Sequence, residues 1–222
     1  MRTESGRAGI QQSADCERPV SLRGDQDGSI GVASVRWFWI DRFVEFESGR
    51  RATALKAVTN TEEQLEGYLA GFPVMPASLI IEGFAQAGGL LVGERGGFQE
   101  RIVLAKVSRC RFHFEARPGD VLRYEISVQD IQSMGAIVHG TSYIGDRVQG
   151  EIELVFAHLD NRFAGVDLFH PDGFLCMLRL FGVYDVGRKP DGSPIEVPQH
   201  LLDAEAKANG RQPGAAAPSG QS

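Results

Sequence analysis

The chain has 222 residues, of which 42% are hydrophobic and 23% are charged, and its formal net charge is −6. This length and composition are typical of one globular domain with extensions, or at most of two small domains. The negative charge argues against a general nucleic-acid-binding protein, because only a local basic patch could offset phosphate repulsion, and the basic cluster at Arg109 and Arg111 is short.

Cysteine usage and the N-terminus bear on where the protein works. The three cysteines, Cys16, Cys110 and Cys176, are isolated and odd in number, which favours a reducing compartment without a disulfide framework. No Cys or His spacing indicates a metal site. The N-terminal residues lack the apolar run of a signal peptide, and the longest apolar segment is interrupted by Glu82 and Gln86 and is too short to span a bilayer. We therefore expect a cytoplasmic protein that binds neither membrane nor nucleic acid.

Both ends of the chain differ in composition from its middle. Residues 1–33 are polar, rich in Gly and Ser and without periodicity, which predicts a mobile arm. Residues 203–222 are rich in small residues, Pro and Gly, and predict a disordered tail. Between them we expect a main domain over 34–160 and a C-terminal extension with a short helix over 161–202.

The main domain begins with a predicted β-hairpin and continues into a helix. Residues 37–47, WFWIDRFVEFE, are aromatic and β-branched, a short turn follows, and ATALKAVT over 52–59 alternates apolar with polar residues. From Ser78 to about Arg95, apolar residues recur at every helical spacing. These roughly 18 residues predict a helix of about 27 Å.

Four strand candidates separated by short turns follow that helix, over 101–116, 121–131, 136–145 and 147–159. Strands joined by tight turns form an antiparallel sheet. A helix that is apolar on nearly all faces must be covered by such a sheet. The sheet can approach closely at the small residues Gly83, Ala85, Ala87, Gly88 and Gly89. The order of elements therefore predicts an α+β fold, with an antiparallel sheet wrapped round one long central helix.

The extension contains a second amphipathic segment over 165–187. Pro171 stands where a first helical residue could be, and Phe174, Leu178 and Phe181 recur on one face. This pattern predicts a helix that packs on the sheet. A role in closing over a ligand remains open.

The central helix carries one carboxylate, Glu82, four residues before Gln86, so both side chains share a helix face. Burial favours the protonated form of a carboxyl group, so the helix either satisfies Glu82 with hydrogen bonds or uses it in chemistry. The preceding loop holds Gly67, Gly71, Pro73 and Pro76, and delivers an irregular backbone to the helix N-terminus. Free N–H groups there can hold a developing oxyanion, which suggests a site for a thioester carbonyl.

The stretch GYLAGFPVMPASLIIEGFAQAGG, residues 67–89, resembles the signature of the 3-hydroxyacyl-acyl-carrier-protein dehydratases, G-H-F-P-G-x-P-x-x-P-G-x-L-x-x-E-x-x-A-Q. The matching residues fall in register without a gap: Gly67, Gly71, Pro73, Pro76, Leu79, Glu82, Ala85 and Gln86. The first hairpin and the segment RCRFHFEARPGD are also similar to that family, so the resemblance covers about 36–158.

The resemblance implies a hotdog fold and a homodimer, with active sites at the dimer interface and no cofactor. The substrate would be presented on the phosphopantetheine of acyl-carrier protein or coenzyme A. Glu82 matches the catalytic Glu, and the N–H of Ala77 would match the donor that binds the thioester carbonyl. Gln86 would brace the helix face, and Gly71 and Pro76 would shape the substrate-binding loop.

The sequence departs from the family where the catalytic His would stand, since that position holds Tyr68 and the following Phe-Pro is Leu69-Ala70. A His can act as a base at neutral pH, whereas a Tyr, with a reference pKa of about 10, is normally a protonated donor. Tyr68 could hydrogen-bond a substrate oxygen, or it could serve as an aromatic plug. We predict that no other histidine replaces the missing one.

Three functions follow from these residues. The first is dehydration of 3-hydroxyacyl thioesters to trans-2-enoyl thioesters through Glu82 and Tyr68, in fatty-acid or lipid biosynthesis. The second is non-catalytic binding of acyl-carrier protein or acyl chains, with possible heterodimerisation with a paralogue that supplies the His. The third is hydrolysis of acyl thioesters, in which Glu82 attacks the thioester or activates water.

Overall fold

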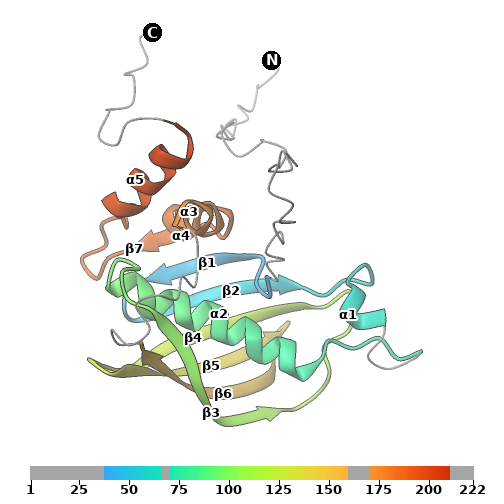
Figure 1. The fold of residues 1–222 in the computed structure, drawn as a ribbon. Coiled ribbons are helices and arrows are strands. Elements are labelled where there is room, and N and C mark those ends of the chain that lie inside the picture. Colours follow the sequence, from blue (N-terminus) through green and yellow to red (C-terminus); the bar gives the residue numbers. More distant parts are fainter. Residues whose placement is uncertain (1–37, 67–70, 160–170, 211–222) are drawn as a thin grey trace, which may run out of the picture. The chain divides into compact units, whose positions relative to one another are not determined.

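The structure is a computed structural model that describes residues 38–66, 71–159 and 171–210. Its strands are β1 (Arg42–Glu47), β2 (Arg51–Ala57), β3 (Ile102–Phe112), β4 (Val121–Gln132), β5 (Gly135–Ile144), β6 (Arg147–His158) and β7 (Gly187–Arg188). Its helices are α1 (Glu63–Glu66), α2 (Ala77–Arg95), α3 (Pro171–Leu180), α4 (Val183–Val186) and α5 (Gln199–Ala208). Figure 1 shows the sheet curving round α2.

The described strands form one sheet in the order β3-β6-β5-β4-β2-β1-β7. All neighbouring strands are antiparallel except β1 and β7, which are parallel. The register shifts in the β1–β2, β3–β6, β4–β5 and β5–β6 pairs, twice in the β3–β6 pair. Bulges of this kind bend a strand and increase its twist, which helps the sheet wrap the helix. The predicted hairpin, central helix and four later strands are confirmed, and so is the α+β class.

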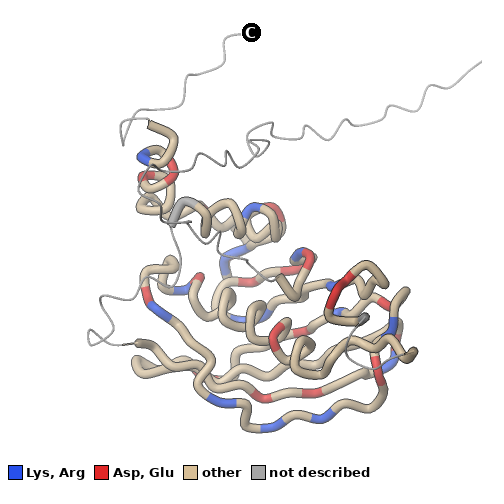
Figure 2. Tube along the Cα trace, turned by 45° about the vertical axis from the view of Figure 1, so that its right-hand side comes forward, with Lys and Arg blue, Asp and Glu red and all other residues tan. Residues whose placement is uncertain are grey.

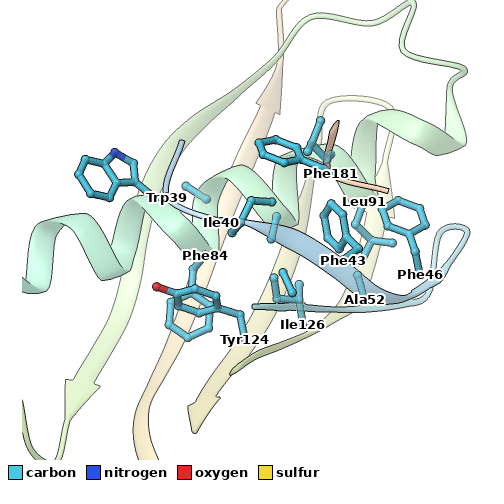
Figure 3. Packing of buried hydrophobic residues seen from close by; sticks show 14 of the residues in the cluster. Trp39, Ile40, Phe43, Phe46, Ala52, Phe84, Leu91, Tyr124, Ile126 and Phe181 are labelled. Atoms are coloured by element: carbon cyan, nitrogen blue, oxygen red, sulfur yellow. The ribbon is translucent and has the colours of Figure 1, made fainter. Parts of the chain in front are cut away.

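Close contact between the sheet and α2 depends on a missing side chain at Gly83. A Cβ atom built on Gly83 would lie 2.8 Å from the carbonyl oxygen of Trp39 and 2.8 Å from the hydroxyl oxygen of Tyr124. Phe84, the next residue, packs its ring edge-to-face on Tyr124 with centroids 4.7 Å apart. The small residues of α2 therefore do admit the sheet, as predicted. Figure 3 shows this packing among the largest buried side chains.

One stripe of α2 is less enclosed than predicted. Ser78 is exposed, and Glu82, Gln86 and Gly89 are half-buried, at the spacing of one helix face. Glu82 therefore lies at the margin of the core rather than inside it.

The helices of the described residues include none with the length and apolar character that a membrane span requires.

The C-terminal extension differs from the prediction in its helices. It contains α3, α4 and α5 rather than one short helix, and α5 continues to Ala208, past residue 203 where a disordered tail was predicted. The reason is tertiary: Leu201 of α5 is buried, and Glu205 forms an ion pair with Arg179 of α3. The start of α3 at Pro171 was predicted correctly.

β3 is a sheet edge that the described residues leave uncovered. Every residue from Leu104 to Arg111 is exposed, and successive strand residues point to opposite faces, so both faces of this middle part of β3 meet solvent. Arg109 lies opposite Glu153 of β6, and Arg111 lies opposite Glu151. Figure 2 shows basic residues along the lowest strand in the view and acidic residues on the strand above it.

Candidate active site

The loop before α2 is fixed at both of its described ends. Gly71 has a φ of 75°, in the left-handed region that glycine adopts without strain. The N–H of Met75 donates to the carbonyl of Ala116 over 2.8 Å, which ties the loop to the β3–β4 connection. The Arg117 guanidinium lies 4.5 Å above the ring of Phe72. The chain therefore reaches α2 along a defined path.

Pro76 caps the N-terminus of α2 with its carbonyl, which accepts from the N–H groups of Leu79 at 2.9 Å and Ile80 at 3.2 Å. The N–H groups of Ala77 and Ser78 belong to the first turn and have no partner within the helix. Both residues are exposed. This end of α2 can therefore offer N–H donors to an anionic oxygen.

Glu82 lies five residues beyond Ala77, an axial distance of about 7.5 Å along the helix. Its Oε1 accepts a hydrogen bond from Nε2 of Gln86 over 3.1 Å. Gln86 Oε1 in turn accepts from the backbone N–H of Trp39 over 2.8 Å. Within the described part of the chain, Oε2 of Glu82 has no hydrogen-bond partner. Among the described residues, the carboxyl group is therefore held through one oxygen only.

The predicted site residues are brought together only in part. Glu82 and Gln86 are joined by a hydrogen bond, Pro76 and Ala77 form the start of the same helix, and Gly71 lies in the loop that precedes it. Tyr68 lies outside the described residues, as do Leu69 and Ala70, so its predicted role stays a prediction.

Three of the described histidines pair with carboxylates other than Glu82. His113 and His139 are exposed and pair with Glu151 and Glu153 of β6, with N–O distances of 3.3 and 2.8 Å. His158 pairs with Glu100 over 3.1 Å. His113 and His139 therefore lie on the sheet surface, as predicted.

Two residues that the sequence analysis missed are Trp39, which contacts Gln86 of this site, and Lys56 of the hairpin. Trp39 contributes its backbone N–H, which side-chain identity cannot reveal. Lys56 occupies a buried position in the alternation of β2, where Ala52 and Ala54 are the other inward residues. A lysine in the inward phase of an alternating strand was the available signal, because an isolated buried charge is costly.

A hollow of about 450 Å³ lies at the opposite end of α2 from the loop, lined by residues that include Glu94, Phe98, Lys189 and Ile195. Burial raises the pKa of the Glu94 carboxyl, and hydrogen bonding from Ser48 and the charge of Lys189 oppose that shift. This hollow is separated from Glu82 by about three turns of helix, so we do not assign it to the same site.

Comparison with known proteins identifies relatives of the main domain. A family profile described as a FabA-like domain matches residues 36–150. The chain is 37% identical over 119 residues to 3-hydroxyacyl-(acyl-carrier-protein) dehydratase FabZ of Pelotomaculum thermopropionicum, which covers 53% of this chain and 85% of that protein. It is 35% identical over 119 residues to the enzyme of the same name from Desulforamulus reducens, covering 53% and 84% of the two chains.

Among solved structures, the dehydratase heterocomplex ApeI:P from Xenorhabdus doucetiae is similar with a TM-score of 0.48 and 17% identity. That match covers 56% of this chain and 84% of the other. The family match ends at residue 150, so the helices of the C-terminal extension lie beyond it.

Proposed function

Because the chain belongs to the FabA-like family of 3-hydroxyacyl-acyl-carrier-protein dehydratases and has their hotdog fold, we propose that it binds 3-hydroxyacyl thioesters and dehydrates them to trans-2-enoyl thioesters. The observation that carries this proposal is the Glu82 carboxyl group, of which one oxygen is hydrogen-bonded among the described residues and the other is not. One oxygen is fixed by Gln86, and the helix N-terminus that could receive a thioester carbonyl lies on the same element. The relatives are named for acyl-carrier-protein substrates, and we propose that class of carrier, or coenzyme A, for this chain.

The elimination requires two proton transfers. A base removes the proton α to the thioester carbonyl, the Cα–Cβ double bond forms, and the β-hydroxyl leaves as water after it receives a proton. The N–H of Ala77 would stabilise negative charge that develops on the thioester oxygen. We assign the base to the Glu82 carboxylate and the donor to the Tyr68 hydroxyl, because a carboxylate is charged at neutral pH and a tyrosine is protonated.

The exposed β3 edge supports a dimeric enzyme. Unpaired strand edges are templates for pairing with another chain, and β3 carries Leu104 and Val107 with 37% and 38% of their surface exposed. We propose that β3 pairs with β3 of a second copy, which would bring a second chain beside the face of α2 that holds Glu82.

Turnover of defined thioesters tests the proposal. The purified protein is incubated with a 3-hydroxyacyl thioester and with a saturated acyl thioester of the same length. Enoyl absorbance from the first substrate is the expected result. Release of free thiol from either would instead favour hydrolysis through Glu82, and binding without turnover would favour a non-catalytic role.

Replacing Tyr68 with His sharpens this test. A histidine at position 68 transfers protons at neutral pH more readily than a tyrosine, so it should raise dehydration by about 10²–10⁴-fold, the usual contribution of general acid–base catalysis. Glu82→Gln should abolish the activity of both forms, and Tyr68→Phe is the matched control that keeps the ring without the hydroxyl. The triple change of residues 68–70 to His-Phe-Pro should also be measured, because a misplacement of about 1 Å can cost 10²-fold. If the wild type, Tyr68→His and the triple variant stay folded and none of the three dehydrates the substrate, the dehydratase proposal is wrong.

A further inference from the structure

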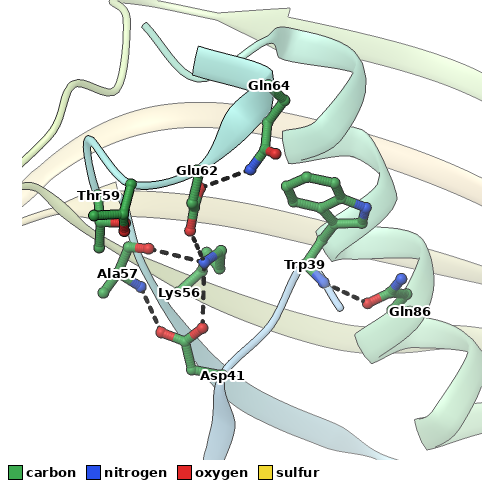
Figure 4. Close-up of polar contacts among 9 residues, drawn as sticks. Trp39, Asp41, Lys56, Ala57, Thr59, Glu62, Gln64 and Gln86 are labelled. Carbon is green, nitrogen blue, oxygen red and sulfur yellow. Dashed lines mark hydrogen bonds and ion pairs between the residues drawn. The ribbon is translucent and has the colours of Figure 1, made fainter. Parts of the chain in front are cut away.

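Lys56 is a buried residue at the centre of a cluster of charged side chains on the hairpin. Its side chain is 8% exposed, and Nζ donates to three acceptors: Asp41 Oδ1 at 3.3 Å, the carbonyl of Ala57 at 2.9 Å, and Glu62 Oε1. An ammonium group has three donors, so the charge is fully engaged. Figure 4 shows these contacts, with Asp41 and Glu62 approaching Lys56 from different segments of the chain.

Asp41 fastens the segment that leads into β1. Its Oδ2 accepts from the N–H of Ala57 over 2.7 Å, and its own N–H donates to the carbonyl of Leu55 over 2.7 Å. Together with the contact to Lys56, these bonds fix residue 41 against the end of β2. Two residues earlier, the N–H of Trp39 holds Gln86 of α2.

The same segment is pressed against α2 at the turn that carries Glu82. Gly83 has no room for a Cβ atom between the Trp39 carbonyl and the Tyr124 hydroxyl, each of which would be 2.8 Å away. Burial raises the pKa of Tyr124, and the charges of Asp41 and Glu62 add to that shift, which places this hydroxyl within the electrostatic reach of the same cluster. Tyr124 therefore stays neutral, and the contact leaves little space for Trp39 to move without moving the helix or Gln86.

We propose that Lys56 is a positioning residue for Glu82. It acts in sequence through Asp41, the backbone of Trp39 and the side chain of Gln86, which fixes Glu82 Oε1. This inference rests on the proposed function, because it assigns Lys56 to the accuracy of the Glu82 carboxyl. A cluster that only stabilised the fold would change the amount of folded protein but not the rate constant of that folded protein.

A double-mutant cycle separates these two roles. Gln86→Ala should lower kcat by about 10–100-fold with little change in KM, the cost of misplacing a reacting group. Lys56→Met should lower kcat by about tenfold alone, and should have no further effect once Gln86 is Ala, because residues acting through one path are not additive. If the double variant instead loses kcat by the product of the two single losses, the effects are additive in free energy and the proposal is overturned.

Two companion variants guard the cycle. Asp41→Asn keeps an oxygen for the N–H of Ala57 and removes a carboxylate that is 45% exposed, so it should fold even if Lys56→Met does not, with a loss of kcat in the same direction. Arg51→Met removes a cation from the same strand that pairs with Glu45 and Glu47. It should leave kcat unchanged, and an equal loss in this control would contradict a specific path.

Hydrogen exchange at the Trp39 amide tests the path without any turnover. The amide should exchange faster in Lys56→Met or Asp41→Asn than in the wild type, and at the wild-type rate in Arg51→Met. If its protection is unchanged in Asp41→Asn, the proposed path is wrong, whatever the enzyme assay shows. Inactive wild-type protein with the expected exchange pattern would instead count against dehydration alone and leave the path standing.

Discussion

At one edge of the sheet, the outer side of β3 is uncovered among the described residues. Toward the other edge, the C-terminal extension covers β1 and supplies the edge strand β7. The N–H of Phe43 in β1 donates to the carbonyl of Phe181 over 2.8 Å, and the backbone N–H of Ser48 donates to the carbonyl of Arg188 over 2.9 Å. The ring of Phe181 packs on Phe38 with centroids 5.0 Å apart. An edge that is covered within the chain needs no partner, so the proposed pairing with a second copy is placed at β3.

Removing the extension would break this comparison most strongly. Deletion of residues 166–222 should lower the melting temperature by about 10 °C or more. The reason is that core side chains of the main domain would lose the buried side chains of α3, α4 and α5 that pack on them. The exposed apolar surface should also bind a hydrophobic dye. Deletion of residues 211–222 alone is the matched control and should leave both measurements unchanged. An unaltered melting temperature after the longer deletion would show that the extension does not stabilise β1.

A single side chain sharpens the same point. Phe181→Ala should lower the free energy of unfolding by about 3–5 kcal/mol, since the side chain is 2% exposed and its removal leaves a cavity. Leu180→Ala, at a neighbouring position that is 62% exposed, should change it by less than about 0.5 kcal/mol. Urea denaturation monitored by circular dichroism measures both, and equal effects would contradict the assignment of Phe181 to the core.

The uncovered edge should respond in association rather than in stability. Val107→Lys places a charge on β3, which blocks strand pairing, and should raise the dimer dissociation constant by about tenfold or more, equivalent to about 1.4 kcal/mol. Val148→Lys changes a residue of equal exposure, 38%, on β6 and should have little effect. Analytical ultracentrifugation decides this, and a wild-type protein that stays monomeric at micromolar concentration would reject the dimer.

The smallest expected effect concerns Glu94, which lies near Ser48 and Lys189 on the covered side. Burial raises the pKa of its carboxyl above 4.5, so the fold favours the protonated form. At low pH, the protonated Glu94 adds nothing unfavourable to the free energy of folding. As the pH rises from about 4.5 through the folded-state pKa of Glu94, the wild type loses stability because the buried group must ionise. Glu94→Gln should therefore be more stable than wild type at pH 8, by less than about 1 kcal/mol because solvent screens the group.

That advantage should disappear at pH 4, where the wild-type carboxyl is protonated as well. Glu196→Gln, an exposed change at the same hollow, is the matched control. Chemical denaturation at both pH values gives the comparison. A Glu94→Gln variant that is less stable than wild type at pH 8 would mean that the charged form is favoured by the fold.

The sequence by itself determined the main elements of this protein and the family to which it belongs. The alternation of β2, the apolar periodicity of α2 and the tight turns between the later strands are local patterns, because adjacent residues experience the same strand or helix geometry. Pro171 marked the start of α3 because the fixed φ and missing N–H of proline suit a first helical position. The in-register residues from Gly67 to Gln86 indicated the family without any knowledge of the fold.

Only the tertiary structure decided which distant groups hold one another. Trp39 and Gln86 are 47 positions apart, and neither residue type predicts a bond between a backbone N–H and that side chain. α5 continues to Ala208 because Leu201 and Glu205 find partners in the fold, although the local sequence is polar. Lys56 is inward because Asp41 and Glu62 meet it there. Contacts of this kind depend on how elements pack, and packing between distant segments leaves no periodicity in the sequence.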